Sequence, residues 1–166
     1  RQRPLSVLDP ACGDGRFLVA ADRRIASIGA TATLTGRDLD PAAIAAASSA
    51  LSAPSEPSGR ADLRQANALT TPWSPQRFDL VIGNPPYLSQ MASATSRGGA
   101  SARGGGPYAD AAAEFLSLAG ELVEPDGGRV ALVLPQSLLA SRDAEAIRSS
   151  IGERAHMVWS WWSDRR

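Results

Sequence analysis

The chain has 166 residues, of which 43% are hydrophobic and 20% are charged, a balance that suits one globular domain with a buried core and argues against disorder. Its 17 basic residues, all of them arginines, match 17 acidic residues, so the net charge is zero. A neutral chain lacks the excess of positive groups that tight binding to nucleic-acid phosphates needs, which counts against a self-sufficient nucleic-acid binder.

Strand and helix patterns alternate through the first part of the sequence. An apolar run at 5–9 predicts a strand, and apolar residues at helical spacing over 16–28 predict a helix after it. A second strand at 33–35 leads to Asp40-Pro41, an N-cap and a first-turn proline that predict a helix over 42–51. The second strand–helix pair therefore repeats the pattern of the first.

The same alternation continues through the middle of the chain. Residues 62–65 have a weak strand pattern, and the compact apolar run at 78–82 predicts a fourth strand that two prolines bring to an end. Apolar spacing predicts a helix over 109–123. Residues 130–134 are apolar throughout, which predicts a strand buried on both faces.

A helix over 142–151 and a strand over 155–162 complete the series. This alternation predicts an α/β fold, a doubly wound and mostly parallel sheet with helices on both faces. Ligands bind such sheets outside the carboxyl ends of the strands. Trp159, Trp161 and Trp162, in the last strand, are expected to pack against or cover the sheet edge rather than to stack on bases.

Several kinds of protein are excluded by what the sequence lacks. No run of eighteen apolar residues is present, and residues 1–4 hold no apolar signal core, so we expect neither a membrane span nor an intact secretory signal. The single cysteine, Cys12, and the single histidine, His156, cannot form a metal cluster or an internal disulfide. We expect no metal and a reducing compartment, the cytoplasm.

Residues 89–106 form a segment rich in glycine, serine and alanine with almost no large apolar side chain, so they cannot pack a core. The segment is either a surface excursion or a lid that orders over a substrate.

Three strand ends carry residues suited to a nucleotide-like ligand. Gly13 and Gly15 let the backbone approach a ligand ahead of a helix with free amides, although a tight turn alone would also need small residues. Asp38 follows about twenty residues later, where an acid commonly binds the two hydroxyls of a ribose. Asn67, after the third strand, could read an adenine edge or could simply belong to a turn.

The fourth strand end, Asn84-Pro85-Pro86-Tyr87, is the most specific. Two prolines fix the backbone so that the Asn84 side-chain oxygen and the Pro85 carbonyl can point into one cavity, and neither proline has a competing amide hydrogen. Two convergent acceptors suit a planar amino group, and the ring of Tyr87 can stack on the plane that carries it. A proline-rich strand stop would explain the prolines but not the asparagine.

The segments DPACGDGRFL, GRDLDP and IGNPPY, in this order and at these spacings, resemble the class I S-adenosylmethionine-dependent methyltransferases, and specifically the adenine-N6 DNA methyltransferases of restriction-modification systems. The opening DPACG favours the DNA enzymes over the related protein-glutamine methyltransferases. The resemblance implies a Rossmann-like sheet in the order 3-2-1-4-5-7-6. Because a seventh strand would need further residues, we expect 1–166 to be a catalytic-domain fragment without a target-recognition domain.

The resemblance also implies a cofactor, S-adenosylmethionine, and a role for each motif residue. The methionine end of the cofactor would be lined by Asp9, Ala11, Gly13 and Gly15. Asp38 would bind the ribose hydroxyls, and Asn67 would stand near the adenine, where the family commonly has an aspartate. The catalytic set would be Asn84, Pro85, Pro86 and Tyr87, with Asn84 and Pro85 accepting from the target amino group and Tyr87 stacking on the flipped base. Cys12 is expected to fill the turn and not to act as a nucleophile.

DNA is the partner that the resemblance implies, bound mostly by regions outside residues 1–166, and a nuclease or specificity subunit could be attached. Two alternatives remain open. The same two acceptors would hold any planar nitrogen, so the substrate could be an RNA base or a protein glutamine amide. The chain could also be a degenerate S-adenosylmethionine-binding scaffold.

Overall fold

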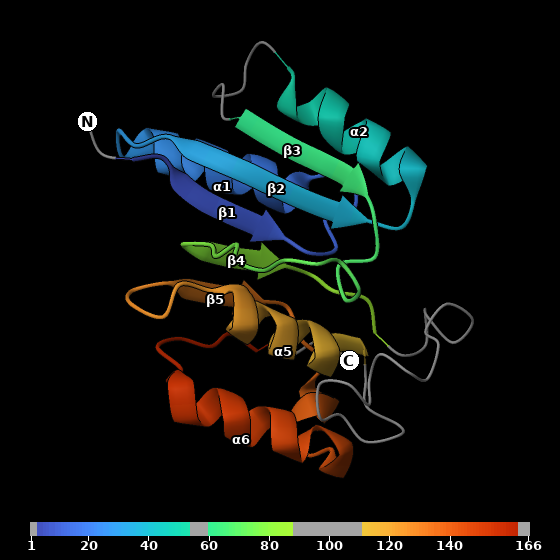
Figure 1. The fold of residues 1–166 in the computed structure, drawn as a ribbon, viewed down its shortest axis with the longest axis vertical. Helices are drawn as coiled ribbons and strands as arrows, with labels where there is room; N and C mark the ends of the chain where they lie inside the picture. The colour runs from blue at the N-terminus through green and yellow to red at the C-terminus, as the bar shows by residue number, and fades with distance from the viewer. Residues whose placement is uncertain (1–2, 54–59, 88–110, 163–166) are drawn as a thin grey trace.

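The computed structural model describes residues 3–53, 60–87 and 111–162, in which a five-stranded sheet is covered by helices (Figure 1). The strands are β1 (Leu5–Asp9), β2 (Ala32–Asp38), β3 (Arg60–Gln65), β4 (Leu80–Gly83) and β5 (Arg129–Leu132). The helices are α1 (Arg16–Ser27), α2 (Pro41–Leu51), α5 (Ala111–Leu122) and α6 (Glu145–Arg154), with short 3₁₀ turns at Gln136–Leu139 and Arg142–Ala144.

All strand pairs in this sheet are parallel, and the strand order is β3-β2-β1-β4-β5. This confirms the predicted doubly wound α/β fold and reproduces the first five positions of the expected strand order. The chain runs outward from β1 to β3 and then returns to β4 on the other side of β1. The carboxyl ends of β1 and β4 therefore flank the point where the strand order reverses, which is where open parallel sheets bind ligands.

Alternate residues of each central strand feed two separate cores. Val7 and Leu8 are both fully buried, but Val7 faces α1 and α2 whereas Leu8 faces α5. The core under α1 and α2 also contains Leu18, Ile25, Leu34 and Ile82, and the core under α5 contains Trp73, Phe78, Val81, Phe115, Leu118 and Leu122. A third cluster joins α5 to α6 through Ala112, Ala113, Leu138, Ala144 and Ile147. The two-sided burial fixes the sheet rigidly beneath its carboxyl ends.

Local signals account for the helix that follows β2. The Asp40 side chain accepts a hydrogen bond from the Ala42 amide over 2.8 Å, and Pro41 occupies the first turn, as the sequence predicts. None of the helices in the described part of the chain has the length and apolar character that crossing a bilayer requires.

The predicted strand over 155–162 is wrong. Helix α6 ends at Arg154, and the residues after it form no strand and lie exposed in the described part of the chain. A strand needs a hydrogen-bonded neighbour, and no described strand lies beside this segment. The expectation that its tryptophans cover the sheet edge is wrong for the same reason, since Trp159 keeps 76% of its surface exposed.

The expectation that the strand at 130–134 is buried on both faces is also wrong. The strand observed there is β5, which starts one residue earlier and is the outermost strand of the described sheet. Val130 is exposed, while Leu132 packs on the core under α5. The segment 89–106, interpreted as a surface excursion or a lid, lies outside the described residues.

Candidate active site

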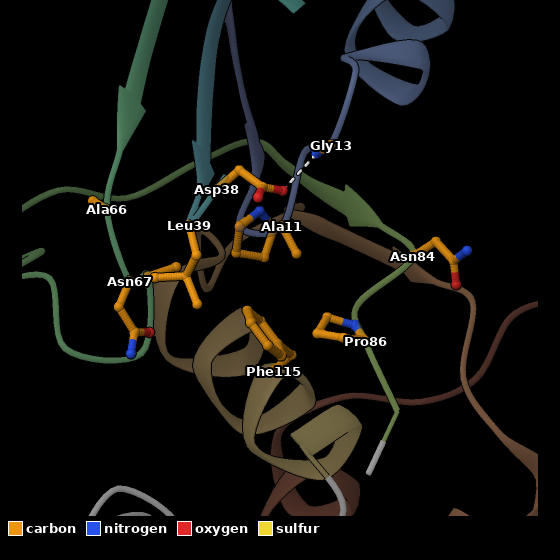
Figure 2. Close-up of a pocket in the computed structure, with 11 residues that line it drawn as sticks. Ala11, Gly13, Asp38, Leu39, Ala66, Asn67, Asn84, Pro86 and Phe115 are labelled. Carbon is orange, nitrogen blue, oxygen red and sulfur yellow. Dashed lines mark hydrogen bonds between the residues drawn. The ribbon is translucent and has the colours of Figure 1, made fainter. Parts of the chain in front are cut away.

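A cavity of about 400 Å³ opens at the carboxyl ends of the strands, next to the point where the strand order reverses (Figure 2). Its size is in the range of small-molecule sites in proteins. It is lined by Pro10, Ala11, Gly13, Asp38, Leu39, Ala66, Asn67, Ala68, Asn84, Pro86 and Phe115. Six of the ten residues predicted for the site thus share one cavity, namely Ala11, Gly13, Asp38, Asn67, Asn84 and Pro86.

The loop after β1 forms one wall of this cavity. Gly13 and Gly15 both have positive φ, 51° and 83°, so they supply the turn that brings the chain from β1 into α1. Gly15 lies outside the cavity lining, where a Cβ atom would stand 3.0 Å from the Cβ of Ala47 in α2. Gly15 therefore serves the turn and the approach of α2, while Gly13 borders the cavity.

Asp38 holds this loop against the end of β2. Its carboxylate accepts from the Gly13 amide over 2.8 Å (Figure 2). It also accepts from the Asp40 amide over 2.9 Å. A carboxylate has about four lone-pair positions, so two remain for a ligand. Leu39, the next residue, adds an apolar surface to the same side of the cavity.

The loop after β3 forms the opposite wall and is built as a turn. Asn67 Oδ1 accepts from the Leu69 amide over 3.0 Å. This hydrogen bond is typical of an asparagine in a turn, the second of the two roles considered for Asn67 from the sequence. The Trp73 indole donates to the Ala68 carbonyl over 2.8 Å. Under it, the buried Arg37 guanidinium stands 5.2 Å from the Trp73 ring centroid and donates to Asp62. Through Trp73, the loop is thus anchored on Arg37 of β2.

The segment after β4 places its asparagine at the far side of the cavity from Asn67, with Pro86 and Phe115 between them (Figure 2). Asn84 is exposed, and its Oδ1 accepts from the Tyr87 hydroxyl over 3.3 Å. The Tyr87 ring packs against the cluster between α5 and α6, outside the cavity lining. Pro85 is fully buried, so only its neighbours line the cavity.

Asp9 lies behind the cavity wall and not on its surface. The side chain is fully buried; Oδ1 accepts from the Ala11 amide over 3.1 Å, and Oδ2 has no hydrogen-bond partner. Burial raises the pKa of Asp9 to about 7 against the opposing Ala11 hydrogen bond, and the charge on Asp38 raises it further. The carboxyl is therefore balanced between its neutral and charged forms near neutral pH.

Cys12 is buried in the same loop, packed against Gly36 of β2. Burial, with the nearby charges of Asp9 and Asp38, raises the pKa of its thiol to about 12. Nucleophilic cysteines react as thiolates, so this residue fills the turn and offers no nucleophile. The described residues hold no cluster of three or more His, Cys, Asp or Glu side chains that could bind a metal ion.

Sequence reasoning missed several lining residues, notably Leu39 and Phe115. Leu39 could have been found from the sequence, because it is an apolar residue that directly follows Asp38, the acid at the end of β2. No local signal marks Phe115, because it reaches the site only through the packing of α5 on the sheet. The Arg37–Trp73 pair was missed for the same reason.

Comparison with known proteins supplies the family. Residues 1–158 match the model of the family described as N-6 DNA Methylase. The chain belongs to the N-6 DNA methylase family. The cofactor of this family is S-adenosylmethionine. No curated protein shows significant similarity to the chain.

Solved structures similar to this N-6 DNA methylase chain share its fold. One is a type I restriction-modification system methyltransferase subunit from Streptococcus thermophilus, with 24% identity and a TM-score of 0.72, covering 92% of this chain and 34% of that one. A Listeria monocytogenes protein assigned to the class I S-adenosylmethionine-dependent methyltransferases has 20% identity and a TM-score of 0.70, covering 92% and 46%. TrmN from Thermus thermophilus has 28% identity and a TM-score of 0.52, covering 78% and 33%. The chain thus spans less than half the length of each of these proteins.

Proposed function

We propose that this chain transfers a methyl group from S-adenosylmethionine to the exocyclic N6 of adenine in DNA. The observation that carries the proposal is that one cavity holds both Asp38, suited to a ribose, and Asn84, suited to a planar amino group. Membership of the N-6 DNA methylase family supports the same reaction.

The cavity's own groups fit the cofactor. Asp38 keeps lone pairs for the two ribose hydroxyls, and Leu39 offers an apolar surface beside them for the flat adenine. Ala11 and Gly13 would lie along the methionine end, with Asp9 behind them and Gly15 shaping the turn. Asn67 would border the adenine, with its Nδ2 group as a donor, since its oxygen already accepts from Leu69. When bound, the cofactor supplies an electrophilic methyl group on a positively charged sulfur.

The target nitrogen needs activation because its lone pair is delocalised into the adenine ring. Asn84 Oδ1 and the Pro85 carbonyl would accept its two hydrogens, tilt the nitrogen toward a tetrahedral arrangement and free the lone pair for attack. As the nitrogen bonds to the methyl carbon, the bond from that carbon to sulfur would break and leave a neutral thioether. The methylated nitrogen would then lose one proton to solvent, and no covalent enzyme intermediate is required. Pro86 fixes the backbone between these acceptors and Tyr87.

Tyr87 would stack on the base after it leaves the helix, as aromatic residues do in enzymes that flip bases. In the structure its hydroxyl donates to the Asn84 oxygen that the target would use. The target amino group would therefore have to displace or share this hydrogen bond, and the Tyr87 ring would have to leave its packing against α5 and α6.

DNA is the proposed substrate, and its affinity and sequence choice would come mostly from regions other than these residues, because this chain has no net charge. A restriction-modification or phage-defence system in the cytoplasm, with a nuclease or specificity subunit, is the setting we propose. A methyltransferase acting on RNA or a protein glutamine remains the alternative, since Asn84 and Pro85 would hold any planar nitrogen.

The test is transfer of a labelled methyl group to duplex DNA, RNA and protein substrates by the full-length protein, followed by identification of the modified atom. We expect label on adenine N6 that falls by orders of magnitude in Asn84→Ala, with cofactor affinity nearly unchanged. Asp38→Ala should instead weaken cofactor binding by about 1.5–3 kcal/mol, the loss expected for charged hydrogen bonds to the ribose. Label on a glutamine amide, or an Asn84→Ala variant as active as the parent, would refute the proposal.

Variants of Asp38 and Tyr87 separate cofactor binding from capture of the base. Asp38→Ala should affect binding of S-adenosylmethionine and of its demethylated product alike, whereas Tyr87→Ala should weaken capture of the base by about 1–3 kcal/mol, the usual value of one base–aromatic stack. Tyr87→Phe keeps the ring and should be mild.

A further inference from the structure

Asp9 presents an unsatisfied polar group directly behind the cavity wall. Its side chain is fully buried at the end of β1, and Oδ2 is buried without a hydrogen-bond partner. The ion pairs found among the described residues do not include it. A buried carboxylate without a cation is costly, so a positive charge that came close would be strongly favoured.

The described groups around Asp9 supply no positive charge to its carboxylate, and one of them carries a negative charge. Asp38, at the end of β2, is a like charge that disfavours ionisation of Asp9. Cys12, in the loop after β1, remains a neutral thiol because burial raises its pKa to about 12. Asp9 itself has a pKa of about 7, so a cation in the cavity would shift its balance toward the charged form.

The position of Asp9 indicates which cation would act on it. A Cβ atom on Gly83, the last residue of β4, would stand only 2.7 Å from Asp9 Oδ1, so the carboxyl lies directly against the start of the Asn84 segment. In the proposed reaction the nitrogen held at Asn84 must come within about 3–3.5 Å of the methyl carbon it attacks. The sulfur that carries this methyl would therefore lie near the wall of the cavity behind which Asp9 is buried.

We propose that Asp9 is a specificity-determining residue that favours the cationic sulfonium of S-adenosylmethionine over the neutral thioether of its demethylated product, and releases its proton to solvent as the sulfonium binds. The inference rests on the proposed function. The two ligands share the same ribose, adenine, ammonium and carboxylate, so the charge on sulfur alone distinguishes them electrostatically. After transfer the sulfur is neutral, Asp9 regains a proton from solvent, and the product is held less tightly than the substrate cofactor.

The test compares binding of the two ligands by calorimetry over pH 5.5–8.5, in pairs of buffers with different ionisation enthalpies. For the unaltered protein, the ratio of the affinity for S-adenosylmethionine to that for the product should fall by up to about tenfold for each pH unit below about 7 and level off above it. Below pH 7, S-adenosylmethionine should release up to about one more proton than the product does. This buffer comparison needs no variant, so it stands even where a variant folds poorly.

The variant arm uses Asp9→Asn, with Asp14→Asn as the matched control. Asp14 is a partly exposed carboxylate in the same loop, paired with Arg16 over 2.8 Å. Asp9→Asn should make the affinity ratio independent of pH and lower than that of the unaltered protein at pH 8, while Asp14→Asn should leave the pH dependence in place.

Three results would overturn the inference. Equal proton release with both ligands, an affinity ratio that does not change with pH, or a pH dependence retained in Asp9→Asn would each remove Asp9 as the selector while leaving the cofactor assignment intact. Failure of both ligands to bind the unaltered protein would overturn the proposed function as well.

Discussion

Replacing Asp9 by asparagine should stabilise the ligand-free protein, and the gain should grow with pH. The folded state raises the pKa of Asp9 from its ordinary 3.8 to about 7, chiefly by burial. The folded protein therefore binds this proton more tightly than the unfolded chain does. Between about pH 4 and pH 7 stability falls as pH rises, because the buried group must ionise. Three pKa units correspond to on the order of 4 kcal/mol.

The assay is urea denaturation followed by circular dichroism at pH 4, 6 and 8. The stability difference between Asp9→Asn and the parent should be on the order of 4 kcal/mol more favourable to the variant at pH 8 than at pH 4. Taking the difference between two pH values cancels any change in packing that the amide introduces. Asp14→Asn, on the exposed side of the same loop, should show almost no such trend. A difference that stays constant from pH 4 to pH 8 would refute the buried, cation-free carboxyl described for Asp9.

Four further results are expected. Gly83→Ala should destabilise the fold by about 1–3 kcal/mol in thermal denaturation, because its methyl group would stand 2.7 Å from Asp9 Oδ1 and because Gly83 has a φ of 154°, which side chains rarely adopt; Asp9→Ala in the same chain should recover only the part of the loss that comes from the contact. Phe78→Ala should cost about 3–5 kcal/mol by urea denaturation, since the ring is buried and packs edge-on against Trp73 at 5.9 Å; an exposed control, Phe17→Ala, should cost far less. The Arg3 guanidinium holds the pKa of Asp79 well below its ordinary value, so the stability this pair adds is fully present above about pH 4 and declines as the pH falls further, and Asp79→Asn should destabilise the protein more at pH 7 than at pH 2. Residues 1–166 should bind duplex DNA weakly and without sequence preference in anisotropy titrations, because their net charge is zero, and tight sequence-specific binding would contradict this.

Short sequence motifs correctly predicted where some helices and strands begin or end. Asp40-Pro41 predicted the start of α2, and the cap is present. Asn84-Pro85 predicted where β4 ends, and the strand stops at Gly83. Because parallel strands bring their carboxyl ends to one edge, Gly13, Asp38 and Asn84 could be expected in one cavity from the order of elements alone, and they are found there.

Features that depend on distant parts of the chain could not be predicted in this way. Phe115 lines the cavity only because α5 packs over β1 and β4, and the guanidinium of Arg37, in β2, meets Trp73 in the connection between β3 and β4. The apolar character of 155–162 resembles that of a strand, but a strand forms only where a neighbour completes its hydrogen bonds. Composition alone could not reveal that Asp9 lies without a cation, since that depends on what surrounds it in space.

The position of β1 in the middle of the sheet has a consequence for folding during synthesis. Strands β1, β2 and β3 and their connecting helices follow one another in the chain and can pair as soon as they leave the ribosome. The other edge of β1 must wait for β4, which follows only after β2, β3 and the connection 66–79 have been made. Until then β1 presents unpaired backbone groups and the apolar side chains of Val7 and Leu8, the kind of edge that aggregates or attracts chaperones. Slow or interrupted synthesis before β4 should therefore expose this protein to misassembly.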